Sequence, residues 1–305
     1  VTYTANPYTV TIESENGDVT AEKVVTDGDN IAIESGKTEL NVKDTVEFTI
    51  DTEAGYTLNE VKVTYLNAEN EKVEVNVTET DGTYSFKMPA ANVTIEVTYT
   101  ANPYTVTIES ENGDITAEKV VTGEDDTETR TPIESGKTEL NVKDTVEFTI
   151  SNVEAGYTLS KVELVNGATA TELTADETGK YTFTMPAANV TIKVTYTADE
   201  YTLSAITEHG TVTAEKVGTP NTGIVFEGTE GQEATKLTVE DTVEFTVTAN
   251  DGYSIAKVEL VNGTTRTELT ATEGKYSFDM VANNATIEVT YTADEYTLSA
   301  ITEHG

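Results

Sequence analysis

The sequence repeats itself along almost its whole length. YTVTIESENGD, which begins at residue 8, begins again at residue 104, and YTLSAITEHG begins at residues 201 and 296. Self-similarity at a fixed spacing is typical of arrays in which each repeat is one folded unit. We therefore expect three β-repeat modules at 8–103, 104–200 and 201–295. The same pattern predicts the tail strand of a preceding module at 1–7 and the first strand of a following module at 296–305, so we expect a longer array.

Apolar and polar residues alternate within each repeat. Tyr8, Val10 and Ile12 share one parity, and Val46 and Phe48 repeat the pattern further along. A period of two with many Val, Ile, Thr and Tyr residues indicates half-buried strands, and turn formers such as NGD, EAG and VNG separate them. The sequence predicts about six to eight strands per repeat. The expected fold class is all-β, a tandem array of three Ig-like β-sandwich modules forming an extended rod.

One strand of each repeat changes parity. In EAGYTLNEVKVTY, Tyr56 and Leu58 are in phase, whereas Val61 and Val63 have the opposite parity. The corresponding segments of the second and third repeats, at 157–164 and 253–260, change parity in the same way. An alternation that changes parity needs one extra residue, so we predict a β-bulge in every copy.

The connections between repeats are short. In NVTIEVTYTANPYTVTIES, the last strand of one repeat runs almost directly into the first strand of the next, and Pro103 stiffens the connection. No connection has the composition of a flexible Gly/Ser linker. We therefore expect neighbouring modules to contact each other and to form a stiff rod.

The composition excludes several classes of partner. The chain has 18 Lys and Arg residues against 55 Asp and Glu residues, a formal net charge of −37, and it contains no Cys. Nucleic acids and anionic membrane surfaces need a basic face, so neither is expected as a partner. The lack of Cys excludes disulfides and thiolate catalysis. No apolar run approaches the length of a membrane span, so we expect no membrane insertion in this segment.

The motifs of the repeat resemble a known family. YTVTIESENGD, DTVEFTI, EAGYTL and YSFKMPAANVTIEVTYT follow one another in an order similar to that of the divergent InlB B-repeat, and more loosely to that of bacterial Ig-like extracellular surface repeats. The resemblance implies a secreted, cell-wall-linked or filament-forming stalk without enzyme activity.

A lysine and an aspartate fall on the apolar parity of each repeat. Lys23 shares its parity with Ala21, and Asp44 shares its parity with Val46. A buried ammonium group needs a partner, so we consider an isopeptide bond, such as occurs in some bacterial pilins. The favoured interpretation is a plain ion pair or a lysine that snorkels to solvent at the end of its strand. The expected pairs are Lys23 with Asp44, Lys119 with Asp144, and Lys216 with Asp241. Alternative acceptors for an isopeptide bond are Asn92, Asn189 and Asn284.

Other polar residues give weaker signals. Two acidic loops could bind Ca²⁺ through Asp27 and Asp29 or through Asp125 and Asp126, but no EF-hand spacing occurs, and solvated loops are the favoured interpretation. His209 and His304 occupy one repeated position, which we expect to be a solvent-exposed turn. No nucleophile pattern accompanies them, so no catalytic residue, cofactor-binding residue or other metal site is expected.

These patterns favour a structural function. We expect a repeat segment of an extracellular stalk or filament of a bacterium or archaeon, which acts as a stiff spacer and could polymerise end to end. The alternative is a cell-surface adhesin whose loops, at 26–32 and 121–132, bind a glycan or a host protein. The expected partners are other copies of the chain or neighbouring modules, with a cell-wall or host glycan as a further candidate.

Overall fold

The described part of the chain consists of strands and turns. The structure, a computed structural model, describes residues 6–218 and 222–298. These residues form strands β1 to β24 and contain no helix, so the predicted all-β fold class is confirmed. Two compact units contain the chain: Val1–Ile108 with Thr116–Thr149 and Leu164–Ile192, and Glu109–Ile115 with Ile150–Glu163 and Lys193–Gly305. The boundary between the units runs through the second sequence repeat, and the three predicted module boundaries stay a prediction.

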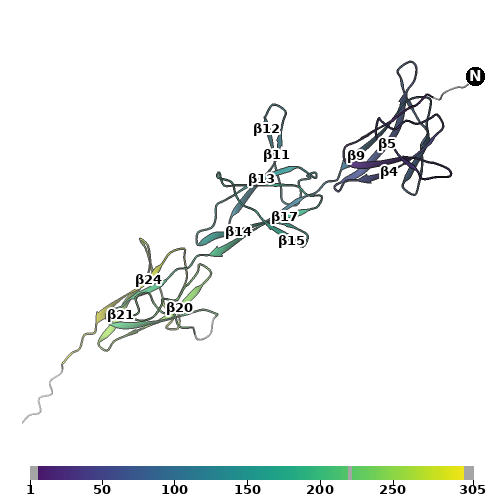
Figure 1. The fold of residues 1–305 in the computed structure, drawn as a ribbon. Helices are drawn as coiled ribbons and strands as arrows, with labels where there is room; N and C mark the ends of the chain where they lie inside the picture. The colour runs from purple at the N-terminus through teal and green to yellow at the C-terminus, as the bar shows by residue number, and fades with distance from the viewer. Residues whose placement is uncertain (1–5, 219–221, 299–305) are drawn as a thin grey trace, which may run out of the picture. The chain divides into compact units, whose positions relative to one another are not determined.

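The first repeat lies in the first unit and forms two sheets (Figure 1). One sheet has the strand order β1 (Val10–Ser14), β9 (Val93–Ala101), β5 (Tyr56–Leu66) and β6 (Lys72–Glu74). The other has the order β3 (Ile31–Ala32), β2 (Gly17–Lys23), β4 (Thr45–Thr52), β8 (Thr83–Lys87) and β7 (Thr78–Thr80). The first and last long strands of the repeat, β1 and β9, pair in parallel.

The apolar parity of both sheets faces one core. Val10 and Ile95 from one sheet and Val46 and Phe48 from the other are at most 1% exposed and belong to a single cluster. The Phe48 ring stacks on Tyr84, with 5.1 Å between ring centroids. Two sheets that bury their inner faces against each other form a β-sandwich, as the alternating pattern predicted.

Among the described residues, the second and third repeats use the same strand orders with fewer edge strands. The second repeat has β10 (Val106–Glu109), β17 (Val190–Ala198), β14 (Tyr157–Asn166) and β15 (Thr169–Glu172) in one sheet, and β12 (Glu128–Pro132), β11 (Asp114–Thr122), β13 (Thr145–Ser151) and β16 (Lys180–Thr184) in another. The third has β18 (Leu203–Ile206), β24 (Ala285–Ala293), β21 (Tyr253–Asn262) and β22 (Thr265–Glu268), then β19 (Gly210–Lys216), β20 (Thr242–Ala249) and β23 (Tyr276–Asp279).

The predicted bulges occur where the parity changes. The pairing of β5 with β9 shifts between Leu58 and Glu60, and the pairing of β21 with β24 shifts between Ile255 and Lys257. The bulge is therefore confirmed in the first and third repeats. Its counterpart in the second repeat, after Leu159, stays a prediction.

Only parts of the two predicted flanking strands are described. Residues 1–5 and 299–305 lie outside the described residues, so the predictions of a preceding and a following module fall largely there. Of the described flanking residues, Asn6 and Pro7 and the segment 296–298 belong to no strand.

Candidate functional site

Each repeat places its lysine and aspartate in an ion pair at the end of one sheet. Lys23 is the last residue of β2, and Asp44 directly precedes β4, which is the neighbouring strand. Lys23 Nζ lies 2.7 Å from Asp44 Oδ2, and both side chains are about four-fifths buried, with 22% and 19% exposed. The pairs are therefore less buried than the parity of the lysines suggested. An isopeptide bond at this position stays a hypothesis.

The other two repeats place the same pair at the same position. Lys119 Nζ lies 2.6 Å from Asp144 Oδ2, and Lys216 pairs with Asp241, which is only 5% exposed. In each pair, the aspartate charge offsets the free-energy cost of holding a lysine ammonium group next to the apolar core.

The aspartate also fixes the conformation of a loop, which we call the tip loop (residues 41–44, 141–144 and 238–241). Asp44 Oδ2 accepts a hydrogen bond from the amide of Asn41 at 2.7 Å, and the amide of Asp44 donates back to the Asn41 carbonyl at 3.1 Å. Asp144 and Asp241 accept the corresponding bonds from Asn141 and Thr238. The lysine therefore orients a carboxylate whose second role is to hold a tight turn.

These contacts keep Asp44 ionised. Burial alone would raise the pKa of the Asp44 carboxyl, but the hydrogen bonds from Lys23 and from the amide of Asn41, together with the lysine charge, outweigh burial and lower this pKa below its ordinary value of 3.8. The tip loop of the first repeat is thus held by a charged carboxylate at neutral pH.

The asparagines proposed as alternative acceptors have a different role. Asn92 Oδ1 accepts the amide hydrogen of Thr9 at 3.0 Å, and Asn189 and Asn284 do the same for Thr105 and Thr202. Each asparagine side chain therefore joins the start of the first strand of a repeat to the residue before its last strand.

A second recurrent element is a turn with glycine at its third position, which we call the glycine turn (residues 53–56, 154–157 and 250–253). The amide of Tyr56 donates to the Glu53 carbonyl at 3.1 Å, and Gly55 has a φ of 92°. Positive φ at the third position of a four-residue turn favours glycine. The Gly55 carbonyl accepts the amide of Asn102 at 2.8 Å, so the turn also holds the chain where it leaves the last strand.

The tip loop of the second repeat packs on the glycine turn of the first, within the first unit. A Cβ atom placed on Gly55 would lie 2.8 Å from the Cβ atom of Val142, so only glycine fits beneath this valine. Lys143 Nζ lies 3.0 Å from Glu53 Oε2 and 5.5 Å from the centre of the Tyr56 ring. An apolar contact, an ion pair and a cation–π contact therefore meet at one joint.

The same joint recurs within the second unit. Val239, from the tip loop of the third repeat, lies against the Cα atom of Gly156 so closely that no Cβ atom fits there. Tyr157 Oη donates to Glu240 Oε1 at 3.0 Å, which replaces the lysine contacts of the first joint. Sequence reasoning missed these residues. The available signal was a valine at the same place in the otherwise polar segments NVKD and TVED, opposite a recurring AGY or DGY.

The acidic loops proposed for Ca²⁺ form no cluster in the described residues. Asp27, Asp29, Asp125 and Asp126 are exposed. Asp125 Oδ1 accepts hydrogen bonds from the hydroxyl and the amide of Thr127, and these bonds lower the pKa of the Asp125 carboxyl. Within residues 6–218 and 222–298, no group of three or more His, Asp or Glu side chains could hold a metal ion.

His209 lies in the expected turn but is half-buried rather than exposed. Its ring stacks on Tyr253 with 3.9 Å between the centroids, and it meets the edge of Tyr291 at 6.2 Å. The prediction of a solvent-exposed side chain was wrong, because two tyrosines of the sheet β18-β24-β21-β22 cover the ring. His304 lies outside the described residues.

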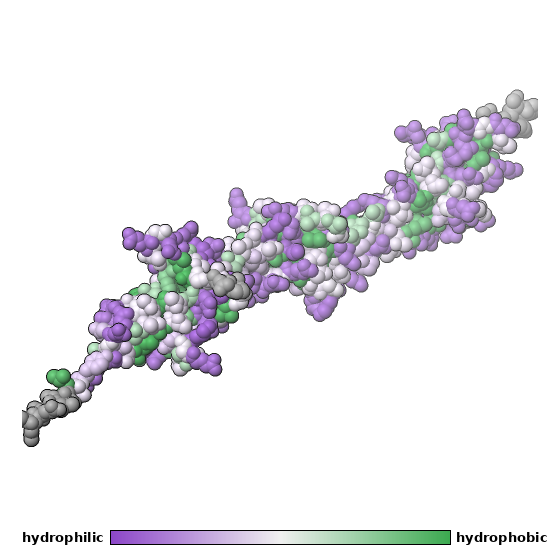
Figure 2. All heavy atoms as spheres, turned by 90° about the horizontal axis from the view of Figure 1, so that it is seen from below, coloured by the Kyte–Doolittle hydropathy of each residue, from purple (hydrophilic) through white to green (hydrophobic). Residues whose placement is uncertain are grey.

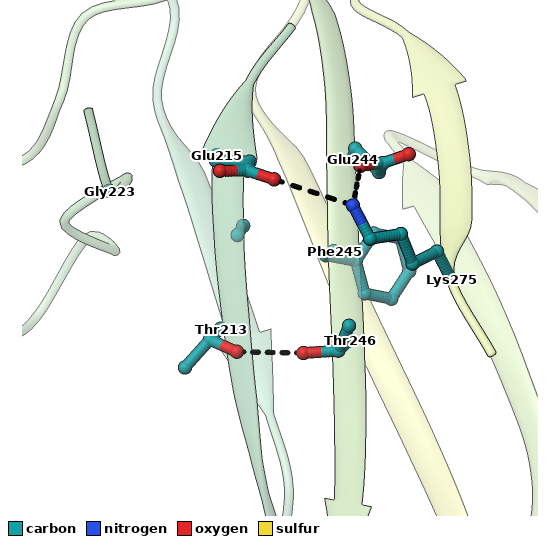
Figure 3. A pocket seen from close by; sticks show the side chains of 8 residues that line it. Thr213, Glu215, Gly223, Glu244, Phe245, Thr246 and Lys275 are labelled. Atoms are coloured by element: carbon teal, nitrogen blue, oxygen red, sulfur yellow. Dashed lines mark hydrogen bonds and ion pairs between the residues drawn. The ribbon is translucent and has the colours of Figure 1, made fainter. Parts of the chain in front are cut away.

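The polar faces of the sheets carry paired charges. Figure 3 shows a pocket lined by residues of β19 and β20. Lys275 pairs there with Glu244, and its Nζ lies 3.6 Å from Glu215 Oε1. The hydroxyls of Thr213 and Thr246 share a hydrogen bond of 2.8 Å. On the face seen in Figure 2, hydrophilic and neutral residues predominate, and hydrophobic residues form separate small patches. The charged and hydroxyl groups of this pocket are therefore paired with one another.

No helix in the described residues has the length and hydropathy needed to cross a bilayer. No family model matches the sequence, and no curated protein matches it. The resemblance to the InlB B-repeat therefore stays an expectation.

Several solved structures of bacterial proteins resemble the chain weakly. The pilus adhesin SpaC from Lactobacillus rhamnosus GG is 12% identical, with a TM-score of 0.32, over 92% of this chain and 55% of that chain. The Bacillus anthracis TIE protein is 12% identical with a TM-score of 0.32, over 92% and 49%. This chain thus spans about half the length of either protein. Similarity at this TM-score supports no argument about fold or function, so the functional assignment depends on the chain's own residues.

Proposed function

We propose that the chain is a structural repeat segment of an extracellular stalk or filament of a bacterium or archaeon, and that it acts as a stiff spacer. The observation that carries this proposal is the recurrent joint, in which Val142 packs on Gly55 and Val239 packs on Gly156. A spacer needs each junction to resist bending, and two junctions built from the same parts supply that property. The resemblance of the repeat motifs to bacterial surface repeats supports the extracellular location.

The strand pairing also suits a load-bearing role. Strand β1 begins the first repeat and β9 ends it, and the two are parallel neighbours over Val10 to Ser14; β18 and β24 pair in the same way in the third repeat. When the two chain ends of a repeat are pulled apart, parallel terminal strands slide along each other. All hydrogen bonds of the pair are then loaded together rather than one after another, which slows forced unfolding.

The net charge of −37 fits the same function. Copies that carry this much like charge repel one another and stay hydrated, which counteracts lateral clumping. Most of the cationic side chains form ion pairs. Arg130, for example, pairs with Glu118, Glu128 and Glu147.

A display experiment tests the spacer function. The full chain is placed between a surface anchor and a fluorescent reporter, and the height of the reporter above the surface is measured molecule by molecule. We compare the chain with a variant that carries Val142→Ser and Val239→Ser, and with a matched control, Val121→Ser, because Val121 is an exposed valine outside the joints.

The proposal predicts one narrow height distribution for the chain and the control. It predicts a lower mean height and a broader distribution for the joint variant, because a hinged chain spans less distance than a stiff one. Equal, broad distributions for all three proteins would contradict a spacer function.

An adhesin is the second candidate, and one observation favours it. The hairpin of β11 and β12 forms the edge of the sheet β12-β11-β13-β16, and its free end projects beyond that sheet in Figure 1. The residues at this end, 121–129, are all exposed. Binding of the chain to a panel of cell-wall and host glycans tests this alternative. Loss of binding after residues 123–127 are replaced by Gly and Ser would favour an adhesin over a spacer.

A further inference from the structure

Each repeat carries two glutamates on neighbouring strands of one sheet. In the third repeat Glu215 lies opposite Glu244, and Figure 3 shows Lys275 reaching between the two carboxylates. In the first repeat Glu22 lies opposite Glu47 in the same way. Like charges directly opposite each other on neighbouring strands destabilise a sheet, so a pair of this kind favours a cation beside it.

The second repeat holds its glutamate pair with two cations. Arg130 Nη1 lies 3.3 Å from Glu118 Oε2 and 2.8 Å from Glu147 Oε2, so one guanidinium group spans both carboxylates. Lys180 Nζ lies 3.3 Å from Glu147 Oε2. The hydrogen bond from Arg130 is the main cause that lowers the pKa of the Glu147 carboxyl, against the opposing effect of burial. In two repeats, therefore, a guanidinium or ammonium group neutralises the pair.

The first repeat has a neutral residue in place of each of these cations. Asn30 stands in the place of Arg130, because IESGKTEL begins three residues later in both repeats. Thr83 stands in the place of Lys180 and Lys275, because each of the three directly precedes the segment YSF or YTF. The glutamate pair of the first repeat is thus left without a cation by two residues of the repeat itself.

The carboxylates of this pair are accessible. Glu22 accepts a hydrogen bond from the side-chain amide of Asn30 at 2.5 Å, which supplies no positive charge. Glu47 is half-buried, and its carboxylate has no hydrogen bond or ion pair among the described residues. Ala32 lies beside Glu22 and Ser85 lies beside Glu47 on the adjacent strands, and these short side chains leave room for a cation from outside.

A neighbouring repeat does not supply the missing cation. At both joints, the contacts with the preceding repeat are made by the tip loop. In the described part of the chain, Glu147 and Glu244 form ion pairs only with cations of their own repeat. The opening at Glu22 and Glu47 therefore follows from the residues around the pair, whichever repeat stands next to it.

We propose that Glu22 and Glu47 form a docking position for an arginine or lysine side chain in a basic segment of a partner protein. Charge complementarity selects this partner, because the net charge of −37 repels a second copy of the chain and attracts a basic segment. Arginine fits best, since its planar guanidinium group can bond to both carboxylates, as that of Arg130 does. The inference goes beyond the spacer function and does not rest on it.

A nuclear magnetic resonance titration of the full chain tests the proposal. The probe is the blocked tripeptide Thr-Arg-Thr, which has the sequence of residues 129–131, and its neutral citrulline analogue is the control. The ionic strength is about 0.02 M, where screening is weak. The arginine peptide should shift the backbone amide signals of Glu22 and Glu47 with a dissociation constant of about 1 mM. The citrulline peptide should leave these signals unchanged.

Three variants locate the contact. Glu47→Gln should raise the dissociation constant about fivefold, because one of the two carboxylates is lost. Glu39→Gln is the matched control: it removes the same charge at an exposed glutamate outside the pair and should leave the constant within about twofold. Asn30→Arg should abolish the shifts, because its own guanidinium group then occupies the pair. Circular dichroism confirms that each variant is folded.

A gain of binding in the third repeat tests the same reasoning. Lys275→Thr gives this repeat the threonine that the first repeat has at the same place. The amide signals of Glu215 and Glu244 should then respond to the arginine peptide as well, whereas they should not respond in the unaltered chain.

Four results would overturn the inference. They are shifts spread evenly over all acidic faces, equal effects of Glu47→Gln and Glu39→Gln, an unresponsive third repeat in Lys275→Thr, and saturable shifts at Glu22 and Glu47 with Ca²⁺ but not with the arginine peptide. The last result would assign the pair to a metal ion. None of these results bears on the reporter height, so the spacer proposal is tested separately.

Discussion

Replacement of Phe48 by alanine tests whether the repeats fold separately. Phe48 is 1% exposed, stacks on Tyr84 and meets the edge of Phe86 at 6.3 Å. Its truncation removes a buried ring and leaves a cavity, which costs about 3–5 kcal/mol. For a unit the size of residues 8–103, the unfolding entropy is roughly 0.2 kcal/mol/K. Its melting temperature should therefore fall by roughly 15–25 °C.

Differential scanning calorimetry shows where this loss appears. If the first repeat folds by itself, a separate transition with about one third of the total unfolding enthalpy should appear at the lower temperature, and the transition of the other two repeats should keep its original temperature. Phe148→Ala and Phe245→Ala should move equal shares, because both rings stack on a tyrosine in the same way. Phe48→Leu serves as the control, with a loss of about 1 kcal/mol. A single transition that shifts as a whole in Phe48→Ala would refute separate folding.

Three further predictions concern single contacts. Asp44→Asn should cost about 1–2 kcal/mol at pH 7 by urea unfolding. Because folding lowers the pKa of this carboxyl below 3.8, the difference should begin to shrink near pH 3.8 and should vanish once the pH lies below the lowered pKa of the folded state; a difference that does not shrink with falling pH would contradict an ion-pair origin. Gly113→Ala should cost about 1–3 kcal/mol because the added Cβ meets the Tyr196 hydroxyl, and adding Tyr196→Phe should recover part of the loss; no recovery would place the strain elsewhere. Asn92→Ala should lower the unfolding force in single-molecule pulling, since it removes the bond to the amide of Thr9, whereas an unchanged force would exclude a mechanical role for that bond.

The local structure was largely predictable from the sequence, because it follows from side-chain periodicity. Alternation of Val46 and Phe48 with polar residues predicted which face is buried, and the change of parity after Leu58 predicted the bulge. Lys23 and Asp44 could be paired because both fell on the apolar parity of their strands.

The joints were not predictable in the same way, because no periodicity marks them. Val142 and Val239 lie in turns, where a single apolar residue gives little periodic signal. Gly55 and Gly156, on which they pack, look like ordinary turn glycines in the sequence. That valine and glycine meet depends on how one repeat follows another in space. Side-chain alternation also could not predict the burial of His209, because its stacking partner Tyr253 is remote in sequence.

The stiffness of the joint is measured most directly by the distance between two spin labels placed across it. The chain contains no cysteine, so Thr80→Cys and Thr129→Cys give two exposed labelling sites, one in each of the first two repeats. Pulsed electron paramagnetic resonance should give one narrow distance distribution, which broadens when Val142→Ser is added. A broad distribution in the chain without that substitution would contradict the account.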